Sequence, residues 1–569
     1  MNLINKLKPK NLSASFWGYA LVILAIIAPW FLKPGYLFMT DMVWGPKINL
    51  DWTGSWFLFN LLVKSLSFIF PIDFLEKIFI SGVLILILLG GSLLTKTILE
   101  FDEVEMAVPA APARGLVFIL SLFALFNPFV YDRALYGQFG VILSYGCLLF
   151  VAAYLLRVYR NLDFKSLYAA AIFTALALLF SVHFIFLLAP FYILFLGALF
   201  LKRQEIKAGG KSKKFWLALF FSFLIVLIIN ANWLLAIAVK ASPLATFVQQ
   251  GITAQDLAAF QTAGKTPLQT FTNVLLMSGF WGKDQFRYFD LTTAPNWQFS
   301  FIFLAPVIFY GVYLSFRRRS RREKIMSAVL LVIFSLAVYL AVGIKSPLTG
   351  GLTIFLYNYL PLYKGLREPQ KWVAVIIPIY LFYLTLGTRR LKDSKLISKN
   401  IPVSAFIFSA VIIMAAPSLF WSFNRQAVPT PYPQDWYSVN QLLLNRSAQS
   451  YGCNDRILFL PWHMYMSFNW VGKIIANPAS TFFSCPVLSG TNMEWGGIYD
   501  NSRSVDGAAV SAWLAAQGKS GSPVLSVTPI RYIILAKELD FRSYLWINNL
   551  SYIRPLLETP TLLVYEIKP

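Results

Sequence analysis

Charged residues are scarce in this 569-residue sequence, at only 13%. Soluble globular proteins carry about 25% charged residues. Hydrophobic residues instead reach 57% of the chain, and the mean hydropathy is +0.62. This balance excludes an ordinary soluble protein and indicates that lipid solvates most of the chain.

Several functional signatures are also missing. The chain contains no GxxxxGK, GxGxxG or HExxH motif, which excludes an ATP-driven motor of the P-loop type. Only two histidines are present, so one chain cannot build a histidine-rich metal site. The three cysteines show no CxxC or metal-ligand spacing. Cys147 lies in an apolar run, whereas Cys453 and Cys485 near the C-terminus are either a disulfide or two free thiols.

The basic residues are clustered between apolar runs. The formal net charge of +23 first suggests nucleic acid, but clusters such as RRRSRREK at 317–324 follow the positive-inside pattern of membrane proteins. We therefore expect the lipid bilayer, and no nucleic acid, as a partner.

Long apolar runs predict about eleven transmembrane helices. The continuous apolar sequence 167–201 is split at His183 into a hairpin, because a single helix would be too long for the bilayer. A cytoplasmic N-terminus places the strongly basic loops on one side, and an odd number of spans places the C-terminus outside. The predicted runs are 16–33, 78–96, 115–131, 139–156, 167–183, 184–201, 215–239, 298–316, 325–343, 372–388 and 402–421.

These runs define the predicted domains. Residues 1–421 form an all-α polytopic membrane domain, with outer segments 34–77, 240–297 and 344–371. Residues 422–569 lack a long apolar run but contain short β-type stretches and helix-like stretches, which predicts a small extracytoplasmic α/β domain. We expect a multi-pass protein of the cytoplasmic membrane.

Acidic residues are almost absent inside the runs and gather in the outer segments. An ion-coupled transporter buries ionisable residues in its helices, so this pattern favours an enzyme at the outer leaflet. No nucleotide pool exists outside, and a sugar donor there must be linked to a lipid phosphate. Transfer then needs a carboxylate such as Asp41 for the acceptor proton, and cations such as Arg133 and Arg367 for the phosphate.

Three features resemble the GT-C glycosyltransferases, which use polyprenyl-phosphate sugars. One is Asp41, an acidic residue early in the first outer segment. Another is the turn Asn127-Pro-Phe-Val-Tyr-Asp-Arg-Ala-Leu-Tyr-Gly-Gln138. The third is Leu366-Arg-Glu-Pro-Gln-Lys-Trp372, which is similar to the FREP-type segment of the arabinofuranosyltransferase-like and YfhO-like branches. Those branches also carry a soluble outer domain at the C-terminus.

The resemblance implies a GT-C-like fold, a catalytic Asp41, a polyprenyl-phosphate sugar donor and a glycan, lipid or protein acceptor. Many GT-C enzymes pair two acidic residues in this segment, whereas Asp41 has no acidic neighbour until Asp51. A divalent metal such as Mg or Mn therefore stays open, and we assign no metal ligand. The candidate substrate-binding residues are Asp51, Arg133, Gln138, Arg367, Glu368, Lys371 and Glu494.

Each assignment has an alternative. Asp41 alternatively caps a helix after Thr40, and Arg133 alternatively extends to headgroup phosphate. Arg367 and Glu368 alternatively fix the start of the next helix. At the level of function, the alternatives are a transporter or flippase of lipid-linked glycans and a non-catalytic scaffold for envelope assembly.

Overall fold

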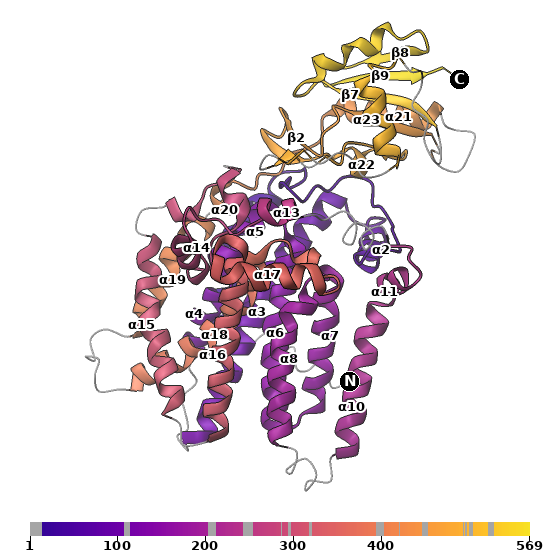
Figure 1. Cartoon of the computed structure of the whole chain (residues 1–569). Helices are drawn as coiled ribbons and strands as arrows, with labels where there is room; N and C mark the ends of the chain where they lie inside the picture. Colours follow the sequence, from indigo (N-terminus) through magenta and orange to yellow (C-terminus); the bar gives the residue numbers. More distant parts are fainter. Residues whose placement is uncertain are drawn as a thin grey trace, which may run out of the picture.

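A computed structural model describes most of the chain, as a helical membrane part with an α/β domain above it (Figure 1). Parts of three predicted inner loops, at 107–113, 203–211 and 394–402, lie outside the described residues. The described residues are 14–106, 114–202, 212–242, 254–285, 287–293, 297–317, 321–393, 403–419, 421–446, 453, 455–492, 494–495, 498–499, 505–519, 521 and 529–568.

Each predicted apolar run overlaps a helix of the membrane part, although two of the runs, 115–131 and 215–239, are each split into two helices. By length and composition, five helices are able to cross a membrane, or up to seven if each bent pair is one span. The chain is therefore a multi-pass membrane protein, while the count of eleven spans stays a prediction. The helices that match the runs are α1 (Ala14–Phe31), α3 (Ile72–Met106), α4 (Arg114–Leu125), α6 (Phe139–Asn161), α7 (Phe164–Phe180), α8 (Phe184–Leu201), α10 (Ser212–Ile229), α15 (Trp297–Phe316), α16 (Arg321–Val342), α18 (Val373–Asp393) and α19 (Val403–Leu419).

Local sequence explains where two of the runs break. After α4 the chain bends by 46° into α5 (Pro128–Tyr136). The Asn127 side chain accepts a hydrogen bond from Val130 N at 3.1 Å, and proline occupies the first helical position, so the sequence itself starts a new helix. α10 bends by 74° into α11 (Ala231–Ala238). The predicted split at His183 is confirmed, since α7 ends before it and α8 begins after it.

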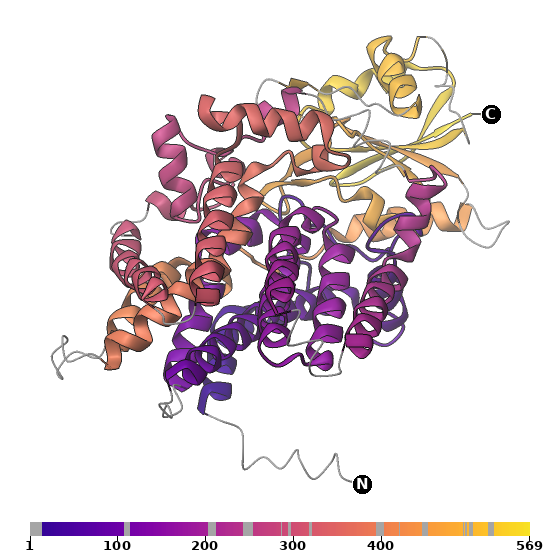
Figure 2. The same ribbon diagram turned by 60° about the horizontal axis from the view of Figure 1, so that its bottom comes forward.

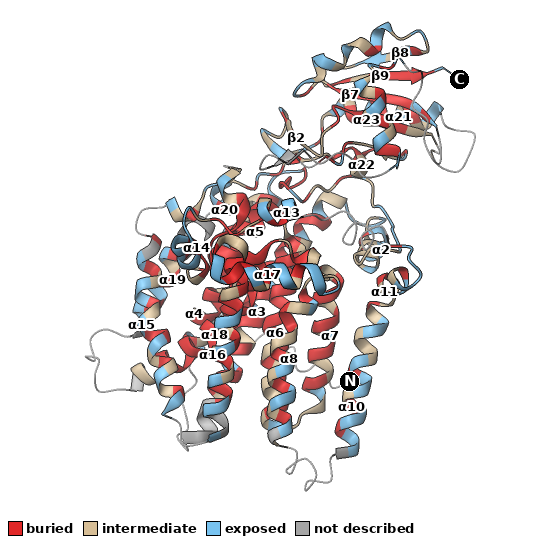
Figure 3. Ribbon diagram, in the orientation of Figure 1, coloured by how far each residue is buried: buried red, intermediate tan, exposed pale blue. Residues whose placement is uncertain are grey.

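Burial divides the membrane part into a core and a lipid-facing rim (Figure 3). All residues in the apolar window of α18 are buried, against 33% in that of α15. Exposed apolar side chains on the rim helices, such as Ile193, Phe220 and Phe309, have lipid as their natural solvent.

Short helices lie between the long helices and the outer domain (Figure 1), and Figure 2 shows the molecule turned so that the lower ends of the long helices come forward. One of them, α2, lies in the first outer segment, 34–77. Most of the others occupy the second and third outer segments, whereas α20 follows the last long helix. These elements are α2 (Phe57–Leu66), α13 (Ala254–Ala259), α14 (Pro267–Leu275), η4 (Trp281–Gln285), η5 (Leu291–Thr293), η6 (Gly343–Lys345), α17 (Pro347–Tyr359), η7 (Tyr363–Leu366), η8 (Pro369–Trp372) and α20 (Trp421–Arg425).

The outer domain is built on a five-stranded sheet of order β4-β1-β7-β9-β8. β1 pairs in parallel with β4 and β7, whereas β9 is antiparallel to β7 and β8. Its elements are α21 (Gln434–Arg446), β1 (Arg456–Leu460), β2 (Tyr465–Phe468), β3 (Lys473–Ala476), α22 (Ala479–Phe482), β4 (Val487–Leu488), β5 (Glu494–Trp495), β6 (Ile498–Tyr499), α23 (Val505–Ala515), β7 (Ile530–Ala536), η9 (Phe541–Asn549), β8 (Ile553–Glu558) and β9 (Leu562–Ile567).

Alternating side chains of the sheet fill two cores. Ile457 and Phe459 pack with Trp436 of α21, whereas Leu458 and Leu460 pack with Trp513 of α23 on the other face. The predicted α/β domain is therefore confirmed. Cys453 and Cys485 form a disulfide, which decides between the two sequence-based alternatives.

Two glycines set the close packing of α15 against α18. A methyl group at Gly311 would clash with the Tyr383 carbonyl, and one at Gly387 would clash with the Val307 carbonyl. We expect Gly311→Ala and Gly387→Ala each to lower stability by about 1–3 kcal/mol, because the helices must separate. Thermal unfolding of the purified protein measures this. Gly197→Ala, which meets nothing within 4 Å, is the matched control. Equal melting temperatures for all three variants would contradict the packing.

Candidate functional site

Asp41 lies in a loop that the membrane part holds from below. At the start of α3, Glu76 accepts a hydrogen bond from Leu37 N at 2.9 Å. Asp41 N donates to the Tyr136 carbonyl at the end of α5, at 2.8 Å. Gly137 makes this approach possible, because it has a φ of 96° and a Cβ there would lie 2.7 Å from Met42 N. The end of α5 thus fixes the position of the Asp41 backbone relative to the membrane part.

The outer domain holds the same loop from above. Ala476 N, at the end of β3, donates to the Thr40 carbonyl at 2.8 Å. Lys47 N donates to the Thr481 carbonyl at 2.9 Å. The loop is therefore clamped between the two parts of the protein.

The Asp41 carboxylate accepts one hydrogen bond from each part. Gln138 Nε2, at the start of α6, donates to Oδ2 at 3.1 Å, and Tyr465 Oη of β2 donates to Oδ1 at 2.8 Å. Asp41 caps no helix, so the capping alternative is wrong. Although the side chain faces an open cavity, desolvation by the surrounding protein raises its pKa to about 6, while the two hydrogen bonds lower it.

A buried ion cluster lies directly behind Gln138. Arg133 Nη1 donates to Gln138 Oε1 and to Glu368 Oε2, the latter at 3.0 Å, and Nη2 donates to Gln370 Oε1 at 2.7 Å. Lys371 Nζ lies 3.3 Å from Glu368 Oε1. Arg133 is completely buried, with the Phe129 and Phe280 ring centroids 5.1 and 5.0 Å from its Cζ. The alternative in which Arg133 extends to lipid headgroups is therefore wrong.

Two cations share one carboxylate in this cluster. Although burial alone would raise it, Lys371 and Arg133 hold the pKa of Glu368 well below its usual range. Glu368 is therefore ionised and neutralises only one of the two cations. The cluster keeps a net positive charge next to the cavity that Lys371 lines.

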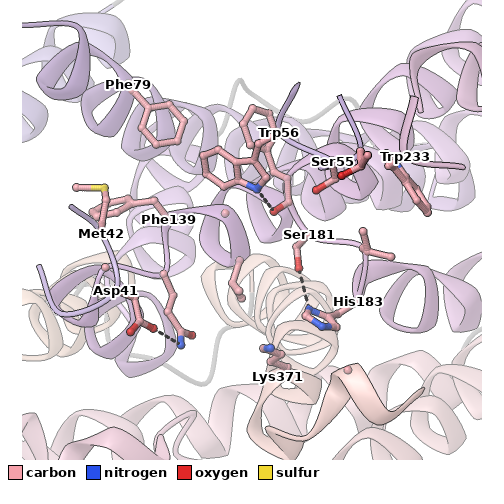
Figure 4. A pocket seen from close by; sticks show the side chains of 18 of the residues that line it. Asp41, Met42, Ser55, Trp56, Phe79, Phe139, Ser181, His183, Trp233 and Lys371 are labelled. Carbon is pink, nitrogen blue, oxygen red and sulfur yellow. Dashed lines mark hydrogen bonds between the residues drawn. The ribbon is translucent and has the colours of Figure 1, made fainter. Parts of the chain in front are cut away.

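A cavity of about 560 Å³ opens beside Asp41. Figure 4 shows Asp41 and Lys371 at its polar end, where His183 hydrogen-bonds to Ser181 Oγ at 3.4 Å. Part of the remaining lining is an aromatic wall, in which the Trp56 indole donates to the Phe180 carbonyl at 3.1 Å. The aromatic lining residues are Trp44, Trp56, Phe79, Phe139, Phe180 and Trp233.

Arg287 is a further cation beside Asp41. Its guanidinium carbon lies 5.6 Å from the ring centroid of Tyr136 and 5.2 Å from that of Tyr465. It is close enough to lower the pKa of Asp41. Its Nη1 donates to Tyr136 Oη at 3.4 Å.

The structure brings together five of the residues chosen from sequence: Asp41, Arg133, Gln138, Glu368 and Lys371. The other three are not part of these contacts, although Arg367 is close enough to Glu368 to lower its pKa. Arg367 pairs with Asp256 at 3.1 Å and its guanidinium stacks on Phe260. Asp51 accepts hydrogen bonds from Thr53 within its own turn and is absent from the described cavity lining. Glu494 belongs to β5, and its side chain lies outside the described residues.

Sequence reasoning missed Tyr465, Arg287 and Gln370. Tyr465 follows Asp41 by 424 residues, and no local motif marks it. The sequence could have indicated Gln370, because this residue belongs to the segment Leu366–Trp372 that resembles a known motif. Arg287 lies in a polar, aromatic stretch of the second outer segment, which signals a site only once the fold places it beside Asp41.

The donor set around Asp41 does not fit a metal site. Both carboxylate oxygens already accept hydrogen bonds, and within the described ranges no group of three His, Cys, Asp or Glu side chains is arranged to hold a metal. We therefore derive no step through Mg or Mn.

Fold and site together define a multi-pass helical membrane protein whose α/β domain contacts the Asp41 loop beside a cavity of the membrane part. No protein-family model matches the chain, and no curated protein matches its sequence. Among solved structures, the chain is similar to ArnT from Cupriavidus metallidurans in the apo state, with a TM-score of 0.47 and 11% identity over 97% of this chain and 98% of that one. At this level the similarity carries no argument about family or activity.

The buried ion cluster should be sensitive to loss of its one carboxylate. Glu368→Gln leaves Arg133 and Lys371 buried without a counter-charge, and we expect a loss of about 3–5 kcal/mol in stability. Thermal unfolding is the measurement. The control is Glu100→Gln, which removes more exposed ion pairs to Lys96 and Arg157 and should cost at most about 1 kcal/mol. Similar losses in both variants would contradict a cluster held by Glu368.

Asp41 should lower stability at neutral pH. Its pKa is raised from 3.8 to about 6 on folding, so the folded state favours the protonated carboxyl, and this stabilisation is lost as the pH rises through about 6. We expect Asp41→Asn to melt about 1–3 °C above wild type at pH 8, a small gain because the open cavity screens the charge. At pH 4 the gain should shrink. A pH-independent difference would show that Asp41 keeps its ordinary pKa.

Proposed function

We propose that this protein is a membrane glycosyltransferase that moves a sugar from a polyprenyl-phosphate donor to an acceptor outside the cytoplasm. The observation that carries the proposal is the cavity that a carboxylate, Asp41, and a cation, Lys371, line together with an aromatic wall. The residues that motivate the resemblance to GT-C enzymes converge there, namely Asp41, Arg133–Gln138 and Glu368–Lys371.

Asp41 suits the role of general base toward the acceptor hydroxyl. With a pKa of about 6 it is mostly ionised at pH 7, yet close enough to neutrality to take up a proton. In the proposed step the acceptor oxygen forms a bond to the anomeric carbon and its proton passes to Asp41. The bond from that carbon to the phosphate oxygen breaks, and the phosphate leaves with the electron pair.

The positive cluster suits the leaving group. A lipid phosphate gains negative charge as the glycosidic bond breaks, and preorganised cations stabilise that charge. Lys371 reaches the cavity directly, and Arg133 stands behind it, with only Glu368 between them as counter-charge. Arg287 adds a positive charge close to Asp41.

The aromatic wall suits the lipid and the sugar. Trp44, Trp56 and Phe79 present apolar ring faces, on which isoprenoid units and sugar rings both pack. A non-catalytic scaffold has no need for a cavity at this position. The Cys453–Cys485 disulfide supports an extracytoplasmic outer domain, because disulfides persist in oxidising compartments.

Transfer of a radiolabelled sugar from a polyprenyl-phosphate donor tests the proposal. We expect Asp41→Asn to lower the rate by about 10²–10⁴-fold, because the acceptor proton loses its base. Wild-type activity should rise as the pH increases through about 6, where Asp41 ionises.

Asp51→Asn is the matched comparison, since Asp51 belongs to the same outer segment but is absent from the described cavity lining. We expect it to keep most of the activity. Undiminished transfer by Asp41→Asn would remove Asp41 from the mechanism. Movement of a lipid-linked glycan across vesicles without any transfer would favour the flippase alternative instead.

A further inference from the structure

The outer domain reaches into the site through one side chain. Tyr465 begins β2, and its hydroxyl donates to Asp41 Oδ1 at 2.8 Å. Its cross-strand partner Ala476 donates its backbone N–H to the Thr40 carbonyl at 2.8 Å. Two neighbouring residues of one hairpin therefore bind two consecutive residues of the Asp41 loop.

We infer that Tyr465 is a positioning residue for Asp41, so that the outer domain completes the site. This inference rests on the proposed function for its catalytic meaning, although the contact itself does not. A loop residue without a helix or strand to orient it keeps two rotatable side-chain bonds. Hydrogen bonds at both carboxylate oxygens, from Gln138 and Tyr465, hold the plane of the carboxylate.

The hairpin is itself anchored, which gives Tyr465 a defined place. Met466 and Phe468 alternate with Tyr465 along β2 and are buried in the core of the outer domain. The Arg287 guanidinium covers the Tyr465 ring. The packing of β2 and the stacked Arg287 guanidinium therefore hold the Tyr465 hydroxyl in position next to Asp41.

The charged and titratable groups around Asp41 belong to four different segments of the chain. Glu368 lies on the side of η8, Arg287 on the segment after η4, Tyr136 at the end of α5 and Tyr465 on β2. Glu368 raises the pKa of Asp41, whereas Arg287 and the Tyr465 hydrogen bond lower it. Removing only the hydroxyl of Tyr465 should therefore move the ionisation of Asp41 to higher pH.

The test compares Tyr465→Phe with Tyr437→Phe, a tyrosine of α21 in the same domain whose ring packs on Phe482 away from Asp41. In the transfer assay, we expect the acidic limb of the pH–rate profile of Tyr465→Phe to move to higher pH. A lost hydrogen bond to a charged group corresponds to about a tenfold loss of rate at pH 6, which should become smaller at pH 8. Tyr437→Phe should keep the wild-type profile.

A second readout does not depend on catalysis. Infrared difference spectra across pH, with Asp41→Asn as the reference, report the protonated Asp41 carboxyl directly. We expect its midpoint to rise in Tyr465→Phe and to stay unchanged in Tyr437→Phe. Wild-type midpoints and pH profiles in Tyr465→Phe would overturn the inference. If wild type transfers no sugar from any lipid donor, the proposed function fails, while the infrared midpoints still decide the role of Tyr465.

Discussion

The pair of hydrogen bonds that Gln138 and Tyr465 donate to Asp41 is the contact on which the site depends. Asp41 belongs to neither a helix nor a strand, so its position comes entirely from contacts. One donor stands at the start of a membrane helix and the other on a hairpin of the outer domain. The carboxylate therefore marks the place where the two parts of the protein meet, and the geometry of the site follows from how they fit together.

Behind this contact, the charge balance of the buried cluster gives the site its chemical character. Burying cations is costly unless counter-charges accompany them, and a fully paired cluster would be inert toward an anion. Here Arg133 and Lys371 share Glu368, which leaves one positive charge uncompensated at the edge of the cavity. The proposed phosphate ligand would supply the missing counter-charge.

Much of the fold could be predicted from the sequence, because it depends on hydropathy and local signals. The apolar runs coincide with helices, the break at His183 follows from bilayer thickness, and Asn127-Pro128 starts a helix through capping. The strands around Arg456, Arg531 and Thr561 follow from short β-type stretches between polar turns. The bend angles and the short helices of the outer segments depend on tertiary packing, which periodicity does not encode.

Several residues of the candidate site could be predicted from the sequence, but the contacts between them could not. Asp41, Arg133 and Glu368 stand out as charged residues next to apolar runs, yet their connection spans 235 residues between Arg133 and Glu368. Arg367 was expected to act with them, but its guanidinium forms an ion pair with Asp256, which no sequence motif indicates. Tyr465 carries no signal at all until the hairpin is seen above the loop. Contacts of this kind come from the global fold.

The central claim is that the cavity beside Asp41 holds a lipid phosphate. Its most direct test is a cryo-electron-microscopy structure of the protein in lipid nanodiscs with a short-chain polyprenyl phosphate. We predict density for the phosphate next to Lys371, with the chain along the aromatic wall and Asp41 facing the open side. Phosphate density elsewhere on the protein, with an unchanged cavity, would contradict the account.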